Sequence, residues 1–136
     1  MSHFGPPVAA ATSNDPLHRM RVYQIAMDLL EAAWADAKTL GGEPVTQQMS
    51  GQLYAAIGSI SANIGEGYSR SSGTDRARFF EYALGSARES MTWYEAARPV
   101  LGQNVTSRLN DLEEIRRLLL AIIPRERAKR GRLSKD

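Results

Sequence analysis

The sequence predicts an all-α protein, folded as an antiparallel up-down four-helix bundle. Along four long segments, apolar residues recur every three or four positions, the spacing of one buried helix face. No segment of useful length alternates between apolar and polar residues with the period of two that is typical of a strand. The loops between the segments are short, so consecutive helices are expected to be antiparallel neighbours. A length of 136 residues indicates one domain.

The first helix is expected over residues 17–40. Asp15 precedes Pro16, which is the arrangement of an N-cap followed by proline in the first helical turn. Gly41 and Gly42 are expected to end the helix, because glycine readily adopts the left-handed conformation found after helix C-termini. The stripe predicted to be buried consists of Met20, Tyr23, Met27, Leu30, Trp34 and Ala37.

The second helix is expected over residues 45–67 and carries two stripes. Its large apolar residues are Val45, Met49, Leu53, Ile57, Ile60 and Ile64. Its small residues, spaced four, three, four and three apart, are Gly51, Ala55, Gly58, Ala62 and Gly65. Glycine costs a helix interior about 1 kcal/mol per residue, so this stripe predicts that another backbone comes close. Both a bundle neighbour and another subunit fit that prediction.

The third and fourth helices are expected over residues 75–101 and 104–123. Thr74 and Asn104 are the residue types that cap helix N-termini, and Pro124 is expected to break the last helix. The predicted core positions of the third helix are Phe80, Ala83, Leu84, Ala87, Met91 and Tyr94. Those of the fourth helix are Val105, Leu109, Leu112, Ile115, Leu119 and Ile122.

Charge is distributed unevenly between the body and the C-terminal end. Residues 1–16 are expected to form a disordered leader. Residues 1–123 carry 11 Lys+Arg and 13 Asp+Glu, a balance of −2, whereas residues 124–136 carry 6 and 2, a balance of +4. A basic tail can hold phosphates by salt-sensitive electrostatics, and a merely solvated tail is an equally good interpretation. The candidate phosphate contacts are Arg116, Arg117, Arg125, Arg127, Lys129, Arg130 and Arg132.

One motif spans the end of the second predicted helix and the start of the third. It consists of Ser59, Ile60, Asn63, Ile64, Glu66, Gly67 and Arg70, followed after a short loop by Phe79, Phe80, Ala83, Gly85, Ser86 and Glu89. This pattern resembles that of the four-helix bundle family called the 23S rRNA intervening-sequence proteins. The resemblance extends over about residues 20–122 and is most specific in its central third.

The resemblance implies a ring-like homo-oligomer, a pentamer. It also implies a relationship to the accessory proteins of diversity-generating retroelements, which work with a reverse transcriptase and nucleic acid. RNA, DNA and a protein are therefore the partners considered beside the chain itself. The sequence departs from the family at Gly65, where alanine is usual, and at Tyr54, Ala55 and Ala56, where the family often has basic residues. The second departure argues against nucleic-acid binding by the body.

Four polar residues of the motif are a candidate site: Asn63, Glu66, Arg70 and Glu89. One interpretation is a pocket in which the two carboxylates bind a ligand or act as acid and base. The favoured alternative is a structural network tying two helices or two subunits together, because buried carboxylates persist when they are paired and hydrogen-bonded.

Composition argues against several function classes. The chain has no cysteine and only two histidines, His3 and His18, so no metal site, disulfide or cysteine nucleophile is expected. Gly65–Gly67 lacks the lysine and preceding strand of a phosphate loop. The longest apolar run, Leu118–Ile123, is too short to cross a bilayer. We therefore expect a cytoplasmic, non-catalytic, cofactor-free homo-oligomeric scaffold, with a nucleic-acid-binding accessory protein as the alternative.

Overall fold

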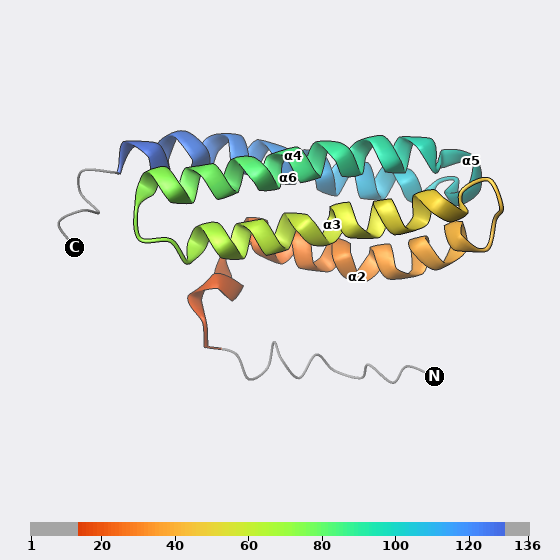
Figure 1. Cartoon of the computed structure of the whole chain (residues 1–136), viewed down its shortest axis with the longest axis horizontal. Coiled ribbons are helices and arrows are strands. Elements are labelled where there is room, and N and C mark those ends of the chain that lie inside the picture. The colour runs from red at the N-terminus through yellow and green to blue at the C-terminus, as the bar shows by residue number, and fades with distance from the viewer. Residues whose placement is uncertain (1–13, 130–136) are drawn as a thin grey trace.

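The computed structural model describes residues 14–129, and within them the chain forms a bundle of four long antiparallel helices (Figure 1). A 3₁₀ turn, η1, precedes the first long helix, and a short helix, α5, lies between the last two. The bounds are η1 Pro16–Arg19, α2 Arg21–Gly41, α3 Gln47–Tyr68, α4 Gly73–Ala96, α5 Arg98–Leu101 and α6 Asn104–Ala128. No strand occurs among these residues, so the predicted all-α bundle is confirmed.

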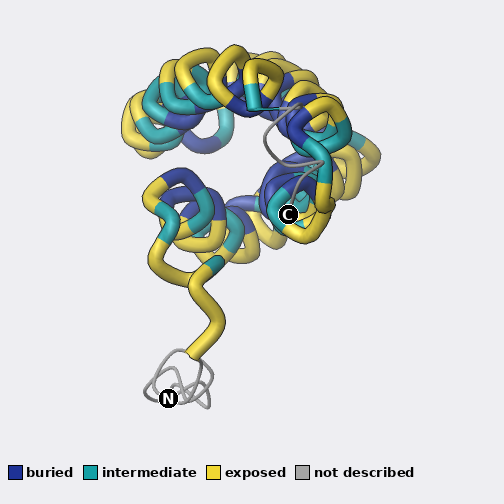
Figure 2. Tube along the Cα trace, turned by 90° about the vertical axis from the view of Figure 1, so that its left-hand side faces the viewer, coloured by how far each residue is buried: buried dark blue, intermediate teal, exposed yellow. Residues whose placement is uncertain are grey.

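Each long helix packs on the next one in the chain. Helix α3 lies between α2 and α4, and α6 lies along α4. The four long helices thus form a closed ring within one chain, in which α2 and α6 are also neighbours. This last pair has the slightest contact of the four neighbouring pairs. Viewed from the end, the buried segments line the inside of this ring and the exposed ones its outside (Figure 2). The helices therefore share one core, and the α2–α6 seam is its weakest side.

The predicted core of three helices is largely confirmed. On α3, α4 and α6 the positions with no exposed surface include Leu53, Ile57, Ile60, Ile64, Phe80, Ala83, Ala87, Tyr94, Leu112, Ile115 and Leu119. Val45 was predicted to join this core and does not, because it lies in the turn before α3 and is 89% exposed.

The buried stripe predicted for the first helix is wrong in its phase. Met27 and Trp34 are 40% and 51% exposed. The side chains that enter the core lie about one position away around the helix: Val22, Ile25, Ala26, Leu29, Ala33, Asp36 and Leu40. Both stripes have helical spacing, and the buried one contains a carboxylate, which is costly to bury without partners. The choice between them depends on contacts from other helices.

The helix starts are capped by fewer side chains than the sequence suggests. Asp15 accepts a hydrogen bond from the Leu17 backbone N–H at 3.0 Å, but it caps η1 and not the first long helix. The predicted start of that helix at residue 17 is wrong, because Met20 is extended and α2 begins at Arg21 without a side-chain cap. The cap of α4 is Ser72, whose hydroxyl accepts from the Asp75 N–H at 3.1 Å, and not Thr74. Asn104 lies inside α6 and makes no cap hydrogen bond.

Proline interrupts one predicted helix but not the other. The expected helix over 75–101 is divided into α4 and α5, because Pro99 has no N–H to continue the hydrogen-bond ladder. The expected end at Pro124 is wrong, because α6 continues through this proline to Ala128. The bundle therefore ends several residues later than predicted. Of the predicted leader, residues 1–13 lie outside the described residues, and of the predicted tail, residues 130–136 do.

Gly67 is the glycine that the helix packing requires. A Cβ atom added there would lie 2.7 Å from Phe80 Cε1 and 3.1 Å from the Arg76 carbonyl oxygen. Phe80 is completely buried, so its ring has little room to move. The close approach of α3 and α4 thus depends on the missing side chain at this position.

We expect Gly67→Ala to lower the free energy of unfolding by about 1–3 kcal/mol, as overpacking of a core does. Gly85→Ala is the matched control, because an added Cβ there meets nothing within 4 Å. The control is expected to stabilise the helix by up to about 1 kcal/mol. Urea unfolding monitored by circular dichroism measures both, and equal effects of the two substitutions would contradict the packing argument.

Candidate functional site

The four polar residues predicted to form a network do not come together. Arg70 Nη2 donates to Glu66 Oε1 at 2.8 Å, and both side chains are about half exposed. Asn63 donates to the Ser59 carbonyl at 2.9 Å, and Glu89 accepts from Trp93 Nε1 at 3.0 Å. Every one of these contacts stays within one helix or its last turn. Only Glu66 and Arg70 are paired as the prediction required.

The register between α3 and α4 explains why Glu89 is separate. Gly67 lies against Phe80, so Glu66 is level with the first turns of α4. Glu89 is nine residues beyond Phe80, about 2.5 helical turns further along. A tight reversal between the helices therefore brings Glu66 near the start of α4 and not near Glu89.

A buried polar cluster that no local sequence pattern predicts joins α2, α4 and α6. Asp36 on α2 is 4% exposed and Tyr94 on α4 is completely buried. The Tyr94 hydroxyl donates to Asp36 Oδ2 at 2.7 Å. Arg108 on α6 donates through Nε to the same oxygen at 2.7 Å and through Nη2 to Oδ1 at 3.3 Å. One carboxylate thus joins three helices.

The electrostatics of this cluster follow from burial and from the shared carboxylate. Burial, reinforced by the hydrogen bond to Asp36, raises the pKa of Tyr94 far above its ordinary range. The hydrogen bond to Asp36 raises the pKa of Arg108. Burial also raises the pKa of Asp111, one turn further along α6. Tyr94 therefore is a neutral donor, and Arg108 a cation, at neutral pH.

A second charged cluster lies at the opposite end of the bundle. Arg76 Nε on α4 donates to Glu126 Oε1 on α6 at 2.9 Å, and Glu126 has only 9% of its side chain exposed. Arg76 Nη1 also donates to the Tyr68 carbonyl at 2.8 Å and the Arg70 carbonyl at 3.2 Å, which close the α3–α4 turn. Lys129 pairs with the other Glu126 oxygen at 3.0 Å. This cluster explains why α6 continues past its proline.

Both clusters have the character of structural clamps. Within residues 14–129 every buried side-chain nitrogen or oxygen has a hydrogen-bond partner. The same residues contain no group of three or more His, Cys, Asp or Glu side chains placed to hold a metal ion. None of their helices is long and apolar enough to cross a membrane. The charges are thus directed at one another and not at an open site.

The candidate phosphate contacts on α6 are mostly occupied by carboxylates. The pairs are Arg116 and Arg117 with Glu113, Arg127 with Glu81, and Lys129 with Glu126. The hydrogen bond from Arg116 lowers the pKa of Glu113. Arg125 donates to its own helix backbone at 3.2 Å. Arg130 and Arg132 lie outside the described residues.

The small-residue stripe of α3 points largely out of the bundle. We call Gly51, Ala55, Gly58, Ala62 and Gly65 the α3 ridge. Gly51, Ala55 and Ala62 are exposed, and a Cβ added at Gly51 meets nothing within 4 Å. At Gly58 and Gly65 an added Cβ meets only the side chains of Leu30 and Leu17, at the ordinary distances of 3.8 and 3.6 Å. At these three glycines no backbone atom of another helix lies within 4 Å of the added Cβ, so the bundle itself does not require them to be glycine.

The segment that carries the ridge has no charged residue. Residues 44–65 contain no Asp, Glu, Lys or Arg, although these make up 24% of the chain. Exposed helix surface normally carries charges, whereas the centres of protein interfaces are depleted of them. The exposed part of α3 thus has the composition of an interface.

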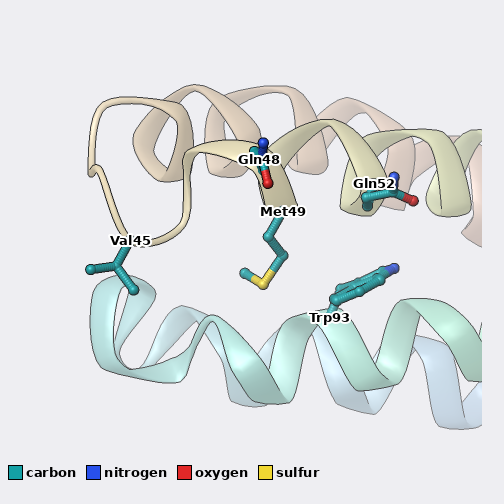
Figure 3. Close-up of a pocket in the computed structure, with 5 residues that line it drawn as sticks. All are labelled: Val45, Gln48, Met49, Gln52 and Trp93. Carbon is teal, nitrogen blue, oxygen red and sulfur yellow. The ribbon is translucent and has the colours of Figure 1, made fainter.

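Two hollows flank the first half of α3. The larger hollow has a volume of about 850 Å³ and lies between α3 and α4; we call it the Trp93 hollow (Figure 3). It is lined by Val45, Gln48, Met49, Gln52 and Trp93. The Met49 side chain extends from α3 toward α4, and the Trp93 ring extends from α4 to a position beneath Gln52 (Figure 3). The smaller, about 240 Å³, lies between α2 and α3 and is lined by Trp34, Ala37, Lys38, Ser50, Gly51 and Tyr54. Both are shallow and open to solvent.

Comparison with known families agrees with the motif around Gly67. The sequence pattern of the family described as "23S rRNA-intervening sequence protein" matches residues 18–121. The chain belongs to this family. The match covers all of α2, α3 and α4 and most of α6, so the family assignment applies to the whole bundle.

A solved structure is similar to this member of the 23S rRNA-intervening sequence protein family. It is the crystal structure of a protein of unknown function from the S23 ribosomal protein family of Bacteroides thetaiotaomicron VPI-5482. The two share 28% sequence identity and superpose with a TM-score of 0.70, over 75% of this chain and 97% of the other. Among curated proteins no match was found.

We expect Asp36→Asn to lower the free energy of unfolding by about 3 kcal/mol, because removing one member of a buried ion pair leaves the other uncompensated. Tyr94→Phe should lower the free energy of unfolding by only about 1 kcal/mol, because Asp36 still accepts hydrogen bonds from Arg108. Glu95→Gln, which breaks an exposed pair with Arg98, is the control and should cost no more than about 0.5 kcal/mol. Urea unfolding at fixed protein concentration compares the three. An Asp36→Asn effect as small as that of the control would refute the clamp.

Proposed function

We propose that this protein is a non-catalytic scaffold whose copies associate through the α3 ridge into a cytoplasmic homo-oligomeric ring, a pentamer. The observation that carries the proposal is the absence of charge from residues 44–65 on a helix whose outer surface is exposed. Small residues along the same surface allow the close approach of a second backbone. Exposed Trp34 beside the ridge adds apolar surface of the kind enriched at interfaces.

The polar chemistry supports a scaffold over an enzyme. Glu66 and Glu89, the carboxylates with the best claim to acid–base chemistry, each have a partner one helical turn away, Arg70 and Trp93. They lie on different parts of the surface, so they do not face a common substrate position. The buried charges serve the fold, as described above.

We expect the native chain to elute as an oligomer in size-exclusion chromatography with light scattering at micromolar concentration, and Gly51→Arg to shift it toward the monomer. The arginine adds charge and bulk to the ridge without a clash inside the chain. Gly85→Arg is the matched control, because Gly85 is also an exposed helical glycine with open space around it, on α4. The control should leave assembly intact.

Two results would count against the proposal. A strictly monomeric native protein would end it. An oligomer that resists Gly51→Arg but dissociates with Gly85→Arg would move the interface from α3 to α4. Circular dichroism of each variant separates loss of assembly from loss of folding.

A second candidate function is a nucleic-acid accessory protein acting with RNA or a reverse transcriptase. The observation in its favour is the balance of +4 over residues 124–136, which a ring would repeat on every subunit. The carboxylate partners of the described basic residues on α6 weaken it.

This second function predicts that the protein binds a structured RNA in a filter assay at low salt. The binding should fall steeply as the salt concentration rises and should be lost when residues 130–136 are removed. This truncation leaves the Arg76–Glu126 pair in place, whereas removal of residues 124–136 would also damage the bundle. The folded truncated protein is the control for non-specific effects. Absence of binding at low salt would exclude this function, and salt-sensitive binding that survives the truncation would exclude the tail as its site.

A further inference from the structure

We infer that Trp34 of one subunit inserts into the Trp93 hollow of the next, so that the hollow is completed by a second copy of the chain. This inference rests on the proposed assembly and specifies its contact. Trp34 is a large side chain, half exposed on α2, with no core position to fill. The hollow is an open, uncharged depression between α3 and α4 (Figure 3).

The two features lie at the same height along the bundle. The Trp34 ring packs edge-on against Tyr54 of α3, with 5.8 Å between ring centroids. Gln52 lines the hollow beside Trp93, two residues and therefore about 3 Å along the helix axis from Tyr54. A cyclic assembly has no translation along its axis. In a ring whose axis runs along the bundle, Trp34 thus reaches the level of the neighbour's hollow without any shift.

The two features also face in directions that close a ring. Trp34 belongs to the α2–α3 side of the bundle, and the hollow to the α3–α4 side. These are neighbouring sides of a four-helix bundle, so they point roughly at right angles to each other. A head-to-tail contact between two sides at right angles turns each copy by about 90° and closes after about four copies, and the five copies of the proposed pentamer need sides about 108° apart. A contact between opposite sides would instead generate an open filament.

The chemistry of the two surfaces matches. The hollow presents Met49 and the Trp93 ring, with the amides of Gln48 and Gln52 at its edge. Met49 and Trp93 suit an indole ring, through sulfur–aromatic and ring–ring contacts. The α3 ridge between the two sides carries no charge. Lys38 lies beside Trp34, and its long flexible stem lets its ammonium group stay in solvent when the two sides meet.

Cysteine cross-linking tests the contact directly, because the natural chain has no cysteine. Lys38 is one turn beyond Trp34 on the same side of α2, and Gln48 lines the matching end of the hollow. Differently tagged full-length Lys38→Cys and Gln48→Cys chains, co-expressed and oxidised, should form a disulfide-linked heterodimer. Lys38→Cys with Gly85→Cys is the collision control and should not. Each single variant alone should stay uncross-linked.

Fluorescence gives a second measurement. The two tryptophans of the chain, Trp34 and Trp93, both belong to the proposed contact, so the native protein can be used without a reporter substitution. In the assembled native protein their emission should be blue-shifted and several-fold less sensitive to acrylamide than in the Gly51→Arg variant.

The outcomes separate this inference from the proposed function. An oligomer in which the tryptophans stay open to acrylamide, or in which Lys38→Cys pairs with itself, overturns the inference and leaves the scaffold standing. A monomer overturns both. A Lys38→Cys/Gln48→Cys heterodimer together with protected tryptophans establishes the contact.

Discussion

The arrangement of the four helices depends most on the hydrogen bonds that the buried carboxylate of Asp36 accepts. Asp36 lies on α2, is buried, and receives hydrogen bonds from Tyr94 on α4 and Arg108 on α6. Helices α2 and α6 have the slightest contact of the four neighbouring pairs of long helices, so this cluster ties the first helix to the last where the helices touch least. Because a buried carboxylate is costly unless every partner is in place, it also sets the relative height of three helices.

Charge is divided between the helices in a way that suits assembly. Helix α6 is rich in charges, and most of these pair with one another or with α2 and α4. Helix α3 has none over residues 44–65, although much of its surface is exposed. Polar clamps thus join the helices at both ends of the bundle, whereas the ridge-bearing segment of α3 carries no charge. This division is the basis of the proposed self-association through α3.

Local sequence rules accounted for the fold class and for three of the four core stripes. Helical spacing on α3, α4 and α6 identified most of their buried positions because each carries one main stripe of large apolar residues. The Asp15 cap follows from a short-range rule as well. The motif at Glu66–Gly67 identified the family, and the structure explains its glycine by the closeness of Phe80.

Features that depend on partners distant in the chain required the folded arrangement. Helix α2 has two stripes of equal spacing, and the buried one contains Asp36, whose partners Tyr94 and Arg108 lie 58 and 72 residues away in the sequence. Pro124 stays helical because Glu126 meets Arg76, 50 residues earlier. Glu89 was grouped with Glu66 on residue type, and the register set by Gly67 against Phe80 separates them. The sequence therefore established which segments are helices and most of what they bury. The tertiary contacts decided the phase of α2, the length of α6 and the membership of the polar clusters, since these rest on energies shared between residues far apart in the chain.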